Sequence, residues 1–152
     1  MMVFCRAGVP MLRLLLCGVM HAAAVKAAGT ELAAADDNRV SRGQAVFIDR
    51  ARGHCLLCHQ VSQIDEPFQG NIGPDLSNIG NRLPPEALYQ RIADPTEMNP
   101  DTAMPAYFRT HKLTQVAQAY VNQPVLSADE MNDLVAFLTT LRTAANPRAP
   151  DQ

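Results

Sequence analysis

The chain has 152 residues and a mass of 16.6 kDa, which suits one folded domain and is too short for two. It carries 13 basic and 15 acidic residues, a net charge of −2. This mild acidity argues against nucleic acid or an anionic membrane surface as a binding partner.

The first 24 residues have the pattern of a secretory signal peptide. Arginines 6 and 13 supply positive charge, Met11–Met20 is a short apolar run, and alanines 22–24 provide a cleavage site. We expect cleavage after Ala24, with Ala27 and Ala35 as alternatives. The apolar run is too short to span a bilayer, so we expect an exported protein without a membrane span.

Cysteine usage narrows the chemistry of the mature chain. Cys5 and Cys17 belong to the expected signal peptide, and lipidation of Cys17 is disfavoured because a leucine precedes it where a small residue is wanted. Cleavage after residue 24 removes two arginines and leaves 11 basic and 15 acidic residues, a net charge of −4. Cys55 and Cys58 remain, too close together to staple distant parts of a domain, so they serve local chemistry.

The remaining chain divides into three parts. Residues 25–38 are rich in alanine and aspartate without apolar periodicity, which predicts a flexible leader. Residues 39–142 are expected to form the compact domain, and residues 143–152, with two prolines, a disordered tail. No segment alternates apolar and polar residues as a strand does, so the predicted fold is mostly α with long loops. A buried cofactor would supply apolar contacts that so small a core lacks.

Apolar periodicity predicts a first helix at Val40–Arg50. Gly43 is unexpected inside it, because a mid-helix glycine costs about 1 kcal/mol relative to alanine. Such a glycine indicates that another backbone approaches closely. Residues 60–84 read mostly as loop. A short helix should then begin at Pro85 and end at Asp94, because the residue before Pro95 is pushed out of the helical region.

Two further helices are predicted in the C-terminal half. Residues 95–111 form a proline-punctuated loop, and Leu113, Val116, Ala117 and Tyr120 follow with helical spacing. Ser127 and Glu130 then form a capping box, which marks the start of a helix. An apolar stripe runs behind this cap, made of Met131, Leu134, Val135, Leu138 and Leu141 with Phe137 alongside.

Cys55-Leu-Leu-Cys58-His59 is the attachment pattern of a c-type haem. Two thiols must reach the two vinyl groups of the porphyrin, and the next residue must present an imidazole to the iron. A structural zinc site would need four ligands, and the mature chain adds only His54 and His111 as imidazoles. A thioredoxin-like redox pair would need a βαβ context, and a plain disulfide would leave the histidine without a role.

The sixth iron ligand is open on the residues alone. Met131 lies on the apolar stripe, where methionine usually fills a core. Met104 precedes a proline that stiffens the backbone presenting its sulfur. The other candidates are Met98, His111 and His54.

A second group of residues has candidate supporting roles around the haem. The Pro74 carbonyl, in Gly73-Pro74, could accept a hydrogen bond from the second ring nitrogen of His59, although the pair also suits an ordinary turn. Arg82 and Arg91 are candidates to pair with haem propionates, or are plain surface arginines.

These residues together resemble class I cytochromes c over residues 39–142. Gly43 and Phe47 match the first-helix motif of that family, and Leu134 and Phe137 match positions of its last helix. The resemblance implies a class I cytochrome c fold in which the two helices cross at the glycine.

A narrower resemblance is to the SoxX family, the monohaem cytochrome subunits of periplasmic SoxAX complexes. It rests on three stretches: residues 70–76 (Gly-Asn-Ile-Gly-Pro-Asp-Leu), 99–105 (Asn-Pro-Asp-Thr-Ala-Met-Pro) and 124–127 (Pro-Val-Leu-Ser). The resemblance implies covalent attachment of one haem c by Cys55 and Cys58, with His59 and Met104 as iron ligands. Asn122-Gln123 departs from a Gly-Lys pair usual in that family.

The resemblance also implies partners. A SoxA-like monohaem or dihaem subunit would carry the catalytic cysteine that joins thiosulfate to a SoxYZ-like carrier, and this chain would pass the electrons to a small soluble cytochrome c. This chain would then be the electron-accepting subunit of an enzyme, and it would contribute no catalytic residue itself. The alternatives are a freestanding electron shuttle and a haem-based sensor with an open sixth site.

Overall fold

The structure, a computed structural model, describes residues 36–114 and 116–142. The expected signal peptide, most of the expected leader and the expected tail lie outside these residues. Within them the chain is helical and has no strand, as predicted. None of the helices in this part of the chain is long and apolar enough to cross a membrane. A helix over residues 36–48 is followed by η1 (Cys55–Leu57), α2 (Ile79–Arg82), α3 (Pro85–Ala93), η2 (Pro95–Glu97), η3 (Gln118–Tyr120) and α4 (Ala128–Thr140).

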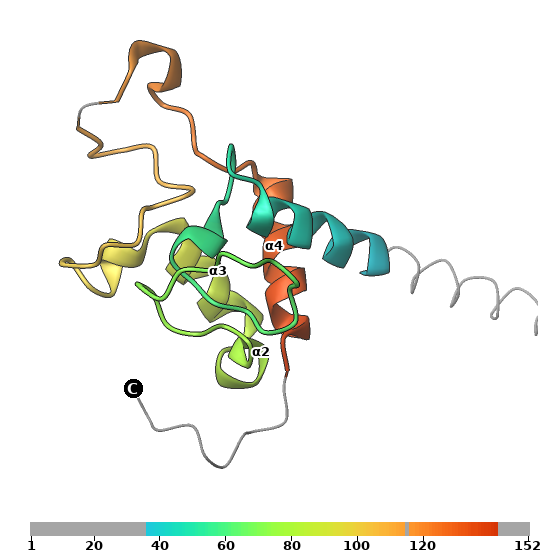
Figure 1. Ribbon diagram of the computed structural model, residues 1–152. Helices are drawn as coiled ribbons and strands as arrows, with labels where there is room; N and C mark the ends of the chain where they lie inside the picture. Colours follow the sequence, from blue (N-terminus) through green and yellow to red (C-terminus); the bar gives the residue numbers. More distant parts are fainter. Residues whose placement is uncertain (1–35, 115, 143–152) are drawn as a thin grey trace, which may run out of the picture. The chain divides into compact units, whose positions relative to one another are not determined.

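The helix over residues 36–48 lies against α4 (Figure 1). It begins four residues before and ends two residues before the expected span, and residues 36–38 of the expected leader are helical. Gly43 is the contact point, because a Cβ there would collide with the carbonyl oxygen of Asp133 and lie 2.8 Å from the Cβ of Phe137. The close backbone approach predicted from this glycine is therefore confirmed.

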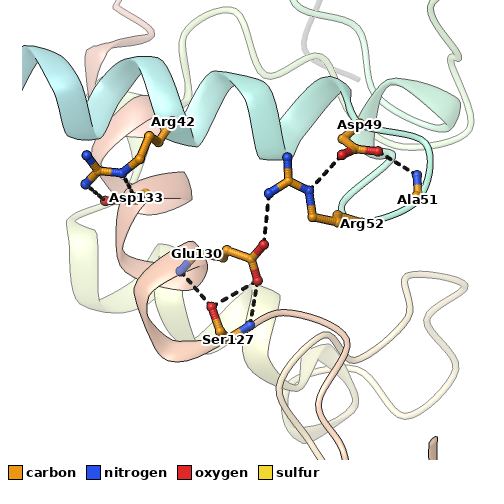
Figure 2. A network of polar contacts seen from close by, with 7 residues as sticks. All are labelled: Arg42, Asp49, Ala51, Arg52, Ser127, Glu130 and Asp133. Atoms are coloured by element: carbon orange, nitrogen blue, oxygen red, sulfur yellow. Dashed lines mark hydrogen bonds and ion pairs between the residues drawn. The ribbon is translucent and has the colours of Figure 1, made fainter. Parts of the chain in front are cut away.

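Arginine–carboxylate contacts join α4 to the helix over residues 36–48 and to the turn that follows this helix (Figure 2). Arg42 donates two hydrogen bonds to the carboxylate of Asp133, at 2.6 and 3.0 Å. Arg52 donates to Glu130 at 3.0 Å, and Glu130 closes the capping box with Ser127 at the start of α4. The predicted capping box is thus present, and its carboxylate also ties α4 to the residues that lead into Cys55.

The helices α2 and α3 pack on α4. Helix α3 begins with Pro85 in its first turn and ends at Ala93, as the proline pattern predicted. Helix α2 was not predicted, because a four-residue helix carries too little periodicity to be recognised. The core between these elements and the helix over residues 36–48 consists of Val46, Phe47, Ile79, Leu88, Ile92, Met131, Leu134, Val135, Phe137 and Leu138, with Leu56, Val61, Ile64, Leu126 and Leu141.

The segment from residue 111 to 125 differs from its prediction. The expected helix over Leu113–Tyr120 is wrong: apart from η3 the described residues there are irregular, and residues 111–114 and 116–125 are all exposed. We call these residues the arm; they run out to one side of the helices (Figure 1, orange). Their apolar spacing is helical, but the apolar side chains have no other element to pack against, and helices depend on such packing for most of their stability.

Candidate haem site

The attachment cysteines lie on a single tight turn. Cys55 begins η1, and the backbone nitrogens of Cys58 and His59 both donate to the carbonyl of Cys55, at 3.1 and 2.9 Å. Residues three apart in a 3-10 turn are eclipsed, so the two thiols project to the same side. Both thiols are free of disulfide bonding, and both side chains are half-buried. This arrangement suits two thioether bonds to one planar ring.

The imidazole of His59 is oriented by the loop that follows. Its Nδ1 lies 2.8 Å from the carbonyl oxygen of Pro74. A carbonyl only accepts hydrogen bonds, so Nδ1 carries the proton and Nε2 keeps its lone pair for a metal. Gly73 lies against the ring, because a Cβ there would collide with Cε1 and lie 2.6 Å from Nδ1. The role considered for Gly73-Pro74 from the sequence is therefore present in the structure.

Residues 70–76 of the same loop run alongside the attachment turn. Gly70 donates to the carbonyl of Leu56 at 2.8 Å, Gly73 to Cys58 at 2.8 Å and Leu76 to Gln60 at 2.9 Å. A side chain at Gly70 would strike the carbonyl of Leu57. These hydrogen bonds hold the turn between Cys55 and His59 in place.

The electrostatics of Cys55 separate haem attachment from a redox pair. Burial raises the pKa of the Cys55 thiol to about 12. Redox-active Cys-x-x-Cys pairs need a lowered pKa, because the thiolate is the reacting species. The absence of strands from the described residues removes the βαβ context, and these residues contain no group of three or more His, Cys, Asp or Glu side chains that could hold a metal ion. The raised pKa of Cys55 favours haem attachment over a redox pair.

The candidates for the sixth iron ligand differ in burial and in their surroundings. Met131 is fully buried in the core, and Met98 is 46% exposed. His111 is exposed on the arm, and His54 precedes the turn in a left-handed conformation (φ 47°). Met104 is half-buried and packs against the core, as Cys55 does. Its backbone nitrogen is held by the Thr102 hydroxyl at 3.2 Å.

Tyr107 is a site residue that sequence reasoning missed. Its hydroxyl donates to the carbonyl of Gly53, two residues before Cys55, at 2.8 Å. Burial raises the pKa of Tyr107 to about 12, so the hydroxyl stays a donor over the neutral range. No pattern in the sequence links positions 54 residues apart, and only the fold brings them together.

The residues present fit a covalently bound haem. Two thiols on one side of a turn, an imidazole with a free Nε2 and a side-chain-free glycine beside that imidazole are the donor set and the clearance that the group needs. Arg82 donates to the backbone carbonyl of Asp75 at 2.5 Å, and Arg91 is exposed on α3. Pairing of either arginine with a propionate stays a prediction.

The family model for cytochrome c matches residues 40–142. The chain belongs to the cytochrome c family. Among solved structures, it is similar to a chain of the crystal structure of SoxXA from P. pantotrophus, with a TM-score of 0.62 and 28% sequence identity over 68% of this chain and 81% of that chain. No curated protein sequence matches the chain significantly.

The cytochrome c family match confirms the predicted fold class and implies a covalently bound haem. Cys55 and Cys58 lie in the sequence pattern that attaches such a haem. The similarity to SoxXA supports the narrower resemblance stated from residues 70–76, 99–105 and 124–127. One departure from that pattern now has a structural meaning. Asn122, where the SoxX family usually has glycine, is left-handed (φ 61°), a conformation that asparagine tolerates better than most residues.

Proposed function

We propose that this chain is the electron-transfer subunit of a periplasmic SoxXA-type complex, holding one haem c through Cys55 and Cys58 with His59 and Met104 on the iron. The similarity to a chain of SoxXA, together with the geometry of the attachment turn, carries this proposal. We further propose residues 1–24 as a cleaved signal peptide, 25–38 as a leader, 39–142 as the cytochrome domain and 143–152 as a tail.

Each of these residues has a distinct task. Cys55 and Cys58 would hold the group by covalent bonds, and the Pro74 carbonyl keeps the proton on His59 Nδ1, which leaves Nε2 free to bind the iron. Bound haem supplies a one-electron iron couple. A thioether from Met104 favours the reduced iron and raises the potential, which suits a subunit that accepts electrons.

The thiols of the mature chain are both committed to the haem, so sulfur chemistry belongs to a partner. In the proposed reaction, a SoxA-like subunit joins the outer sulfur of thiosulfate to a thiol of a SoxYZ-like carrier. The new S–S bond releases the thiol proton and two electrons. This chain takes the electrons one at a time and passes them to a soluble cytochrome c.

An apolar surface beside the attachment turn supports a permanent partner. Phe68 is 87% exposed, Ile72 is 74% exposed and Leu57 is 59% exposed. Leu57 lies between the two attachment cysteines, and it lines one groove together with Phe68. We call Leu57, Phe68 and Ile72 the attachment patch. A permanent interface places apolar side chains at its centre, whereas a mobile shuttle is steered by a charged rim.

We propose the SoxA-like subunit as the occupant of the attachment patch, because docking there would bring a second redox group close to the turn that carries Cys55 and Cys58. The freestanding shuttle is the alternative, and the apolar character of the patch argues against it. Docking of the soluble electron acceptor would then use another part of the surface.

Purification of the tagged chain from its native periplasm tests this function. We expect a second haem protein at a stoichiometric ratio, and reduction of the pair by thiosulfate only when a carrier thiol is added. A lone monomer that is indifferent to thiosulfate and carrier would leave a class I electron shuttle and contradict the proposal.

The variant Phe68→Ser tests the docking surface in the same complex. Truncating an interface centre typically weakens binding by about tenfold or more, so the partner should be lost on washing. Val125→Ser removes an exposed apolar side chain from the arm and is the matched control. Loss of the partner in the Val125 variant alone would place the interface on the arm instead.

A further inference from the structure

Tyr107 is anchored to three separate parts of the domain. Its backbone nitrogen donates to the carbonyl of Ile92 in α3 at 3.1 Å, and its own carbonyl accepts from Leu126, just before α4, at 3.0 Å. Its hydroxyl donates to Gly53 at 2.8 Å. All three polar groups of this residue are therefore used to hold distant segments together.

The acceptor of the hydroxyl is itself fixed. Gly53 is buried, and a Cβ there would collide with the carbonyl oxygen of Val46 in the helix over residues 36–48. Cys55 follows two residues later. The Tyr107 hydroxyl thus bonds to a part of the backbone that cannot move without shifting the attachment turn.

Tyr107 also lies close in sequence to the proposed ligand, three residues after Met104. Between residues 99 and 106 the hydrogen bonds are local: Thr102 to Asn99, Asp101 to Asn99 and Met104 to Thr102. Tyr107 is the first residue after Met104 that is bonded to another element. Within residues 36–114 and 116–142, its hydroxyl forms the one hydrogen bond between the connection over residues 95–126 and the attachment segment over residues 53–59.

We infer that Tyr107 is a positioning residue for the sixth iron ligand. Its hydroxyl ties the loop that carries Met104 to the backbone that leads into Cys55, and this link limits how far the loop can move from the attachment turn. The inference rests on the proposed ligation by Met104. Without the link, the loop opens more often and leaves the sixth position of the iron accessible to outside ligands.

Titration of the ferric holoprotein with imidazole measures this opening, because imidazole binds only where the thioether has left the iron. In Tyr107→Phe the ring and its packing stay, and one hydrogen bond is lost. We expect the apparent affinity for imidazole to rise about two- to tenfold, the range that one net hydrogen bond supplies. Tyr120→Phe, an exposed tyrosine on the arm, should match the wild type.

Two further variants separate the possible failures. Ile79→Val, a buried change of comparable cost to folding, should leave imidazole affinity unchanged, because it weakens the fold away from the loop. If Ile79→Val raises the affinity as much as Tyr107→Phe does, the effect is general destabilisation and the positioning role is overturned.

Met104→Ala reports on the ligand itself. It should bind imidazole far more tightly than the wild type and lose the absorption band of iron–thioether ligation. If it does so while Tyr107→Phe equals the wild type, the positioning role is wrong and the ligation stands. If Met104→Ala changes neither readout, the proposed ligation is wrong and the inference falls with it.

Discussion

Residues 53–74, which comprise the attachment segment and the loop after it, are built in the opposite way to the arm. Residues 53–74 are held by hydrogen bonds between distant parts of the chain, including those of Gly73 to Cys58, His59 to Pro74 and Tyr107 to Gly53. The hydrogen bonds within the arm are local, such as Tyr120 to Ala117 at 2.8 Å, and its residues are exposed.

The difference shows where this small domain fixes its geometry. A haem ligand must be held in place before the iron changes its redox state. Around His59 this is done by hydrogen bonds between distant parts of the chain, and glycines leave room for the close contacts. The arm takes no part in that arrangement. Its base is closed by the bond from Leu126 to Tyr107, so changes along the arm should leave the site undisturbed.

The largest effect is expected for Gly73→Ala. The added methyl group collides with the His59 ring, so either the ring or the loop must shift. Overpacking of this kind costs about 3 kcal/mol of unfolding free energy, and the haem spectrum should change as the imidazole turns. Denaturant unfolding and absorption spectra of the holoprotein measure both. The neighbouring Ile72→Ala, exposed, should change stability by less than about 0.5 kcal/mol.

A wild-type spectrum and wild-type stability for the Gly73 variant would contradict the close contact between this glycine and the imidazole.

An intermediate effect is expected for Asp133→Asn. The hydrogen bond from Arg42, above all, lowers the pKa of Asp133. A lowered folded-state pKa contributes stability above the unfolded-state pKa and loses it as the pH falls through the folded-state value. We therefore expect the variant to lose about 1.5–2 kcal/mol at pH 7, the lower part of the range for a hydrogen bond to a charged group because the Arg42 side chain is half-exposed, and to show a flatter stability profile below about pH 5.

Denaturant unfolding at a series of pH values measures this profile, with the exposed Asp65→Asn as the control. Equal acid sensitivity in wild type and Asp133→Asn would show that the contact in Figure 2 does not set the acid dependence.

The smallest effect is expected in the arm. Asn122 has a positive φ of 61°, so Asn122→Ala should cost about 1 kcal/mol and Asn122→Gly should be neutral or slightly stabilising. Neither change should alter the haem spectrum or the imidazole affinity. An altered spectrum in either variant would show that the arm is coupled to the site, and the contrast between the two regions would fail.

Features with a local signal were predictable from the sequence. The capping box at Ser127 and the proline boundaries of α3 depend on residues close together in the chain, and both are found as predicted. The attachment motif is also local, and the structure places its two cysteines on one tight turn. Gly43 indicated that another backbone approaches the helix closely, because a mid-helix glycine lowers stability and is expected only where a larger side chain would not fit. The orientation of His59 by Pro74 was also suggested, since a metal-binding imidazole needs a second partner.

Features that depend on packing were not predictable. The spacing of Leu113, Val116 and Tyr120 is helical, but spacing does not say whether a partner surface exists, and here the residues are exposed. The hydrogen bond from Tyr107 to Gly53 joins positions far apart in sequence, so no local sequence pattern predicts it. The sequence pattern alone did not decide whether Met98 or Met104 is the better candidate for the sixth iron ligand. In the structure Met98 is exposed and Met104 is half-buried.

The central claim is that one haem is held covalently at Cys55 and Cys58 and ligated by His59 and Met104. The most direct test is to mature the full chain in a host that attaches c-type haem, and to record intact mass and absorption for the wild type, Met104→Ala and Met98→Ala. We predict the mass of one haem in all three, and loss of the iron–thioether band in Met104→Ala alone. A mass without haem, or loss of the band in Met98→Ala instead, would contradict the account.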